Sequence, residues 1–376
     1  MNTTYLTARQ LRDALQLRDL TDPAAGPHAM QMLVSAIVTA LTRRWSVPAR
    51  WLRPSPLVAI EDNYDRLGFS REAVTRDARY SRYVSPSLML RSHTSAAMPS
   101  QLRSIDPRAE LDELVVVPGL VYRRDAIDRT HVGEPHQLDL WRLSSRARLD
   151  ADDLDEMLGL IAQVVLPGSQ WRTVPASHPY TVGGRQLDVL VDGAWLELGE
   201  CGMVAPALLN QSGLDARVWS GLAAGVGLDR ALMLRKAITD IRFLRSTDPR
   251  IQSQMLDLAR WRPVSSLPVI SRDISIVIGA EDDDETIGDV IRAALAERID
   301  DLEYVRVLTR TSYHDLPDRA RQRLGLSPDQ INALVRIVIR PLTRTLTDDE
   351  ANVLRDRIYL AVHQGPQKEV IAEPAQ

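Results

Sequence analysis

A run of small residues leads directly into a helix-period apolar segment, and it restricts the fold more than any other part of the chain. Trp219–Arg250 reads WSGLAAGVGLDRALMLRKAITDIRFLRSTDPR. Because glycine has no Cβ, the backbone of such a run can approach a ligand closely. Arg230 stands at the start of the expected helix, where the dipole favours anions and a planar guanidinium suits phosphate oxygens. The pattern predicts a strand, a tight glycine-rich turn and a helix that begins with a phosphate-binding arginine.

The same run has a second interpretation that involves no ligand. A strand–helix junction also needs small residues wherever two elements pack closely. Two further polar stretches favour the ligand. One is LMLRSHTSA at 88–96, and the other is the segment 114–141, in which a valine-rich strand is followed by Arg123, Arg124 and Asp125.

Size and composition exclude several classes of protein. A chain of 376 residues suits two or three domains with a real core. A single cysteine, Cys201, excludes an intrachain disulfide and suits a reducing compartment. The chain lacks an apolar run of about 18 residues, and its first residues are too polar for a secretory signal. We therefore expect a cytoplasmic protein with no membrane association.

Hydrophobic periodicity outlines the remaining elements. An amphipathic helix is expected over 30–41, followed by strand near 45–60 that Pro54 and Pro56 confine to an edge or break. A helix over 151–166 and a strand over 194–204 come next. Later elements follow the order strand, helix, strand, strand, helix, which suits a ferredoxin-like sandwich. Their expected ranges are 273–278, 286–298, 302–308, 333–339 and 347–363, the last one capped by Thr347 and Glu350.

These stretches, in this order, resemble class II aminoacyl-tRNA synthetases, and in detail phenylalanyl-tRNA synthetases of the single-chain or alpha-subunit type. Motif 1 corresponds to about 28–60, motif 2 to about 114–141 and motif 3 to about 219–236. The resemblance implies an α+β fold with a class II antiparallel-sheet catalytic domain over 1–264. It also implies a ferredoxin-like anticodon-binding-type domain over 265–365 and a flexible tail over 366–376.

The resemblance further implies a site for ATP and Mg²⁺. Arg123 and Arg230 would be the catalytic residues, placed beside the α- and γ-phosphates. Glu197 would hold the metal. The other residues expected to contact ATP are Asp125, His131 and Gly227.

The amino-acid pocket implied by the resemblance departs from the family in several places. Its expected residues are His93, Ser95, Gln137, Asp139, His178, Tyr180, Ala223, Ala224 and Gly225. Asp139 replaces a glutamate, His178 and Tyr180 replace two phenylalanines, Ala224 replaces an aromatic residue, and Glu200 replaces a glycine. These changes predict a polar or enlarged aromatic substrate. The alternative is drift in a chain that has only two phenylalanines, Phe69 and Phe243.

The implied function is ATP-dependent activation of an aromatic, phenylalanine-like amino acid and its transfer to tRNA. One alternative is an adenylating enzyme with a non-tRNA acceptor, and another is a non-catalytic regulatory paralogue, which the intact Arg123, Glu197 and Arg230 disfavour. Residues 265–363 hold 13 arginines, no lysine and 18 acidic residues, a net charge of −5. Since RNA affinity comes largely from cationic contacts, this charge weakens the case for tRNA. We expect a monomer or homodimer.

Overall fold

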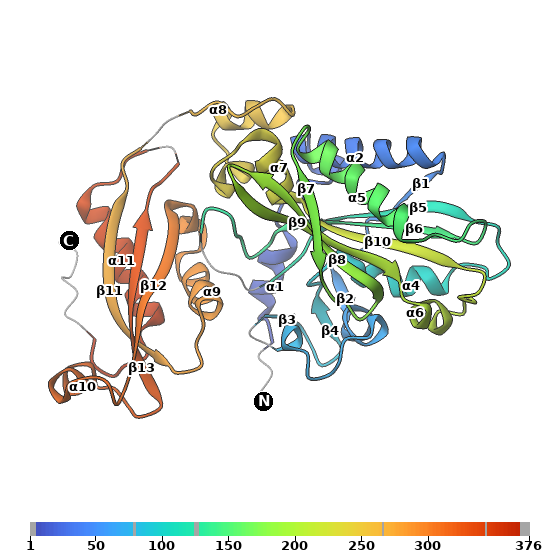
Figure 1. Cartoon of the computed structure of the whole chain (residues 1–376). Helices are drawn as coiled ribbons and strands as arrows, with labels where there is room; N and C mark the ends of the chain where they lie inside the picture. Colours follow the sequence, from blue (N-terminus) through green and yellow to red (C-terminus); the bar gives the residue numbers. More distant parts are fainter. Residues whose placement is uncertain (1–4, 78–79, 124–127, 265–266, 343, 369–376) are drawn as a thin grey trace. The chain divides into compact units, whose positions relative to one another are not determined.

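The chain forms two compact units (Figure 1). The computed structural model describes residues 5–77, 80–123, 128–264, 267–342 and 344–368. The first unit consists of 1–123, 134–238 and 252–261, and the second of 124–133, 239–251 and 262–376.

A seven-stranded sheet is the centre of the first unit. Its order is β1-β5-β6-β10-β9-β8-β7, and every neighbouring pair is antiparallel except β1 with β5. The strands are β1 (Ala49–Trp51), β5 (Asp112–Leu120), β6 (His136–Ser144), β7 (Trp171–Pro175), β8 (Thr181–Val191), β9 (Ala194–Val204) and β10 (Ser220–Gly227). The predicted α+β class with an antiparallel sheet is confirmed.

Three helices pack together beside this sheet (Figure 1): α2 (Ala29–Trp45), α5 (Ala151–Val165) and α7 (Leu228–Lys236). The buried residues of α2 include the apolar set expected at helical spacing: Met30, Leu33, Val34, Ile37, Val38 and Leu41. The helix predicted over 30–41 is therefore confirmed, and it extends beyond both predicted ends. Among the described residues, no helix is long and apolar enough to cross a membrane.

The strand expected near 45–60 is broken. Its first part is β1, at the edge of the large sheet, and its second part is β2 (Leu57–Ala59), which pairs in a separate sheet with β4 (Leu88–Leu90). The third strand of that sheet is β3 (Arg82–Tyr83). Pro54 and Pro56 lie between the two parts, as expected for residues that lack a backbone N–H. Shorter helices complete the first unit: α1 (Ala8–Leu15), α3 (Ile60–Asn63), α4 (Met98–Arg103) and α6 (Pro206–Gln211). Helix α8 (Pro249–Gln252) belongs mostly to the second unit.

The prediction of a glycine-rich turn before Arg230 is wrong. Strand β10 runs directly into α7, with Gly227 as the N-cap, and the glycines of this strand all have negative φ. They are needed for close contact instead. A Cβ on Gly221 would lie 2.8 Å from Cγ2 of Val204, and one on Gly225 would lie 3.1 Å from Nε2 of Gln137. The small residues thus let neighbouring side chains lie over the strand.

The end of α7 explains one of the two lysines in the chain. Lys236 is buried, and its Nζ donates to the carbonyl and Oδ1 of Asp257 at 2.8 and 3.0 Å and to the carbonyl of Ala259 at 2.7 Å. An ammonium has three donors, so three oxygen acceptors satisfy it completely. The contacts fix the segment after α8 against α7, the helix whose first turn carries Arg230.

The second unit contains a three-stranded antiparallel sheet in the order β11-β13-β12. Its elements are β11 (Ile270–Gly279), α9 (Asp284–Leu295), β12 (Leu302–Ser312), α10 (Asp318–Leu324), β13 (Gln330–Ile339) and α11 (Asp348–Val362). Helices α9 and α11 contribute Ile291 and Ile358 to a core shared with the sheet. The predicted element order and the capping box of Thr347 and Glu350 are confirmed, whereas α10 was not predicted.

Candidate active site

Strand register places three candidate positions in one row across the large sheet. Asp139 on β6 lies opposite Gly225 on β10, and Gly225 lies opposite Glu200 on β9. Residues directly opposite in neighbouring strands project from the same face. Because Gly225 has no side chain, the row is a slot between two carboxylates.

A β-bulge brings a third carboxylate to this face. On β8, Gln186 pairs with Glu200 and Asp188 pairs with Glu197, although Glu200 and Glu197 are three residues apart. The extra residue, Leu198, forms the bulge. In a regular strand residues at i and i+3 point to opposite faces, but the bulge returns them to the same face. Glu197 and Glu200 therefore share the face of Asp139.

Two hydroxyl groups support Asp139. Thr94 Oγ1 and Ser95 Oγ donate to Asp139 Oδ2 at 2.6 and 2.8 Å, and all three residues are buried. Burial raises the pKa of Asp139, and the hydroxyl groups oppose that shift. Gln137 Oε1 accepts from Thr94 N at 3.4 Å. Ser95 thus acts in this structure by holding the carboxylate beside the slot.

His93 lies in the same segment as a neutral ring. It stacks on Phe69 at 5.6 Å between ring centroids, and both ring nitrogens are buried with no hydrogen-bond partner among the described residues. Burial, and secondarily the charge of Arg123, lowers the pKa of His93 to about 3. A neutral His93 can donate one hydrogen bond to a substrate and accept one, but it carries no positive charge.

An aromatic wall continues from His93 to β8. Tyr180 stacks on Trp141 with centroids 5.8 Å apart, and its ring is 5.6 Å from that of His178. His178 Nε2 lies 2.7 Å from Glu200 Oε2. A cavity of about 10 Å³ is enclosed by Asp139, His178, Tyr180, Thr181, Glu200, Cys201, Ala223, Ala224 and Gly225. Strand alternation places Ala224 and Cys201 on the face opposite to Ala223 and Gly225, so Ala224 is at the edge of the cavity.

We expect the His178–Glu200 contact to be an ion pair in solution. The hydrogen bond to Glu200 raises the pKa of His178, and the bond to His178 lowers the pKa of Glu200. In Glu200→Gln the pKa of His178 should fall, which an NMR titration of the imidazole measures. The stability from the raised histidine pKa is present below the ordinary pKa of about 6.5 and is lost as pH rises through the folded-state value. An unchanged His178 pKa in the variant would show that the pair does not form.

The cationic residues lie at the end of this face. Arg123 is exposed, and its Nε donates to the Ser92 carbonyl at 2.9 Å while Nη2 donates to Gln137 Oε1 at 3.4 Å. Arg230 Nη1 donates to the backbone carbonyl of Glu197 at 3.1 Å. Gly227 is exposed, and a Cβ built there would meet no atom within 4 Å. Two guanidinium groups and an open backbone are what a polyphosphate requires.

The donor set fits a hard divalent cation. Desolvation and the charge of Glu200 raise the pKa of Glu197, and Arg230 opposes the shift. A cation beside Glu197 would relieve the repulsion between these carboxylates, and Mg²⁺ takes one or two carboxylates together with phosphate oxygens. Within the described ranges there is no cluster of three or more side chains of His, Cys, Asp or Glu placed to hold a metal.

Sequence reasoning missed a buried histidine network beneath Arg230. His136 Nδ1 lies 3.1 Å from Asp229 Oδ1, its backbone N–H donates to the same carboxylate, and Nε2 accepts from Leu20 N at 3.0 Å. With Nε2 as an acceptor, Nδ1 carries the proton. The network fixes the first turn of α7 to β6, and only the adjacency of Asp229 to Arg230 in the sequence hinted at it.

The roles of two further expected ATP contacts stay predictions. Asp125 lies outside the described residues. His131 belongs to the second unit, where its Nδ1 is 2.7 Å from Asp128 Oδ2.

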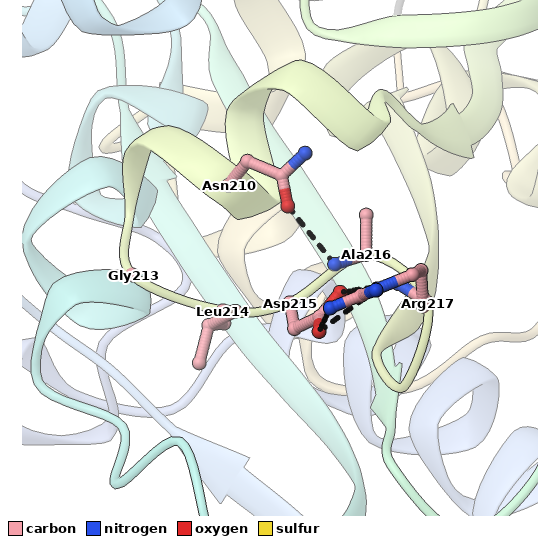
Figure 2. Close-up of a pocket in the computed structure, with 6 residues that line it drawn as sticks. All are labelled: Asn210, Gly213, Leu214, Asp215, Ala216 and Arg217. Carbon is pink, nitrogen blue, oxygen red and sulfur yellow. Dashed lines mark hydrogen bonds and ion pairs between the residues drawn. The ribbon is translucent and has the colours of Figure 1, made fainter.

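A second, open depression of about 490 Å³ lies in the loop after α6 (Figure 2). Asn210 Oδ1 accepts from Ala216 N at 3.0 Å, and Arg217 pairs with Asp215 at 2.7 Å. None of the expected site residues lines this depression.

Comparison with known proteins identifies related chains. The family model "tRNA synthetases class II core domain (F)" matches residues 5–255. The "Phenylalanine--tRNA ligase, chloroplastic/mitochondrial" of Arabidopsis thaliana is 30% identical over 319 residues, which are 81% of this chain and 68% of that protein. The "Phenylalanine--tRNA ligase alpha subunit" of Prochlorococcus marinus (strain MIT 9313) is 36% identical over 51% of this chain and 56% of that subunit.

The chain therefore spans about two thirds of the plant relative and little more than half of the bacterial subunit. A solved pyrrolysyl tRNA synthetase structure from Desulfitobacterium hafniense aligns with a TM-score of 0.44 at 15% identity, over 63% of this chain and 77% of that one. That structural similarity is too weak to support a conclusion.

Proposed function

The chain belongs to the family of class II tRNA synthetase core domains, and on this premise we propose that it activates an aromatic, phenylalanine-like amino acid with ATP and transfers it to tRNA. The resemblance to this family predicted from the motifs is confirmed. The observation that carries the proposal is the single sheet face that presents a buried carboxylate, Asp139, and has two arginines at its end, Arg123 and Arg230.

The first step is attack of the amino-acid carboxylate on the α-phosphate of ATP, which releases pyrophosphate and forms an aminoacyl-adenylate. Asp139 and Gln137 would bind the α-ammonium group, and Arg123 would orient the attacking carboxylate against the α-phosphate. Arg230 would neutralise the charge of the departing pyrophosphate. The protein accelerates such a step by positioning and by preorganised charge.

No covalent enzyme nucleophile is required. Cys201 is buried, its Sγ donates to the carbonyl of Arg185 at 3.2 Å, and burial raises its pKa to about 12. The thiol is therefore protonated at neutral pH and cannot serve as a thiolate.

Glu197 would hold Mg²⁺ beside Arg230. When bound, the ion supplies charge neutralisation for the phosphates. The backbone carbonyl of Glu197 also accepts a hydrogen bond from Arg230, and this contact would orient the guanidinium beside the metal site.

The second step transfers the acyl group to the 3′ end of a tRNA. We assign catalysis to 1–264, tRNA recognition to the ferredoxin-like region 265–365, and the tail to 366–376, of which 369–376 lie outside the described residues. The oligomeric state, monomer or homodimer, and the cytoplasmic location stay predictions. The two alternative functions gain no support from the relatives.

The electrostatics of the second unit limit how it could bind RNA. Arg336, Arg340 and Arg344 pair with Asp273, Glu303 and Glu350 at 2.8, 2.7 and 2.8 Å. Internal pairs reduce the charge available for phosphates. We therefore expect tRNA recognition by this unit to depend on shape and base contacts more than on net charge.

Amino-acid-dependent ATP–pyrophosphate exchange, followed by acylation of total tRNA, tests the function. We expect exchange with aromatic amino acids and acid-precipitable aminoacyl-tRNA. Protein that binds ATP but shows no exchange with any aromatic amino acid, with or without tRNA, would refute the proposal.

A further inference from the structure

An ion pair forms one wall of the amino-acid cavity. His178 lies in the turn before β8, Glu200 lies on β9, and their side chains are 18% and 43% exposed. The other walls are fixed more firmly: Tyr180 is stacked on Trp141, and Gly225 is part of the central strand β10. The pair is therefore the part of the wall that can move most freely.

The cavity is too small for a substrate side chain as it stands. Its volume of about 10 Å³ is close to the least that holds one water molecule. An aromatic ring enters only after a wall side chain moves, and the partly exposed His178 and Glu200 are the ones free to do so. Substrate entry therefore disturbs the hydrogen bond between these two residues.

The chemistry of the entering ring then decides the outcome. An unsubstituted phenyl ring would desolvate an ionised carboxylate and return no hydrogen bond, which is unfavourable. A carboxylate accepts about four hydrogen bonds. Glu200 can therefore accept from His178 and from a ring substituent at the same time, provided that the substituent is a donor.

The two carboxylates of the slot suit different parts of an amino-acid substrate. Asp139 and Glu200 are opposite one another with only Gly225 between them. Asp139 is buried and receives two hydroxyl donors, so it suits the α-ammonium group that every amino acid carries. Glu200 is on the far side of the slot, beside the aromatic wall of Tyr180 and His178, where a side chain would lie.

We propose that His178 and Glu200 determine specificity, and that they select an aromatic amino acid whose ring bears a hydrogen-bond donor, a hydroxyl or amino group, over phenylalanine. This inference rests on the proposed function. It assigns a role to Glu200, whose carboxylate faces the pocket because the register of β9 places it opposite Gly225 of β10.

Competition between substrates in pyrophosphate exchange tests the inference. The panel is phenylalanine, tyrosine, 3-hydroxyphenylalanine and 4-aminophenylalanine, each assayed for kcat/KM with the full-length wild-type chain. We expect at least one ring-substituted substrate to exceed phenylalanine by about tenfold or more, because a site built around a polar partner discriminates strongly against an analogue that lacks it. The double variant His178→Phe with Glu200→Gly should move this ratio toward phenylalanine by about tenfold.

A matched control breaks an ion pair elsewhere in the same unit. Asp215→Asn removes the exposed Asp215–Arg217 contact in the depression of Figure 2 and should leave the substrate ratio unchanged. A wild-type preference for phenylalanine would overturn the specificity inference and leave the proposed function standing. Absence of exchange with every amino acid would overturn both. The ratio of kcat/KM values is measured on the wild-type chain, so this test does not depend on whether a variant folds.

Discussion

Arg230→Ala is expected to reduce the rate of amino-acid-dependent pyrophosphate exchange by about a thousandfold or more while the protein stays folded. The guanidinium lies in the first turn of α7, where the helix dipole adds to its attraction for phosphate oxygens. The hydrogen bond that it donates to the carbonyl of Glu197 is at the surface. Since loss of an exposed hydrogen bond costs little stability, the defect should appear in kcat and not in the melting temperature.

Two further variants separate charge from geometry. Arg230→Lys keeps a positive charge but loses the planar fork, and an intermediate rate is expected. Arg235→Ala removes an arginine from the last turn of the same helix and should change the exchange rate by less than about twofold. Activity of Arg230→Ala within that range would exclude the phosphate role of Arg230.

The regular elements could be predicted because their physics is local. Apolar spacing marked α2, and β9 was expected at 194–204, the bounds that the structure gives. The turn before Arg230 could not be predicted from the glycines. Glycine serves both positive φ and close packing, and only the contact of the Gly225 position with Gln137 shows that packing decides here.

The same distinction between local and long-range features applies to the site. Residues within single motifs, such as Asp139 and Arg230, could be proposed from the sequence. The His178–Glu200 and His136–Asp229 contacts could not, because they join residues 22 and 93 positions apart in the chain that only the sheet brings together. The bulge at Leu198, which the sequence also does not reveal, decides the face on which Glu197 lies. Without it, alternation would place Glu197 and Glu200 on opposite faces of the sheet.

The charge count of the second unit was also a poor guide, because a count ignores which charges the fold pairs with one another. A count gives Arg336 and Arg340 as two cations of β13 and its end, yet they pair with Asp273 and Glu303. An arginine is fully available to a ligand only where no acidic side chain of the same chain pairs with it. Such pairing follows from strand register. Arg336 and Asp273, for example, are direct partners across β11 and β13.

Asp139→Asn is expected to raise the KM for the amino acid by about 30- to 100-fold, with little change in the KM for ATP, because a charge-assisted hydrogen bond to the α-ammonium is lost. Asparagine has the shape of aspartate, and its Oδ1 can still accept from Thr94 and Ser95. Glu113→Gln is the matched control, since it changes a buried carboxylate paired with Arg50 at the edge of the sheet. That variant should lower the melting temperature without changing the KM for the amino acid.

The pH dependence of the KM for the amino acid distinguishes a binding role of Asp139 from a structural one. Burial raises the pKa of Asp139, so its proton is bound at a higher pH than on an ordinary aspartate. As pH falls through that value the carboxylate loses its charge, and the wild-type KM for the amino acid should rise. In Asp139→Asn this rise should be absent, since the amide does not titrate. A KM profile that is identical in the two proteins would show that Asp139 only supports the segment at 94–95, and the α-ammonium would then have to bind elsewhere in the slot.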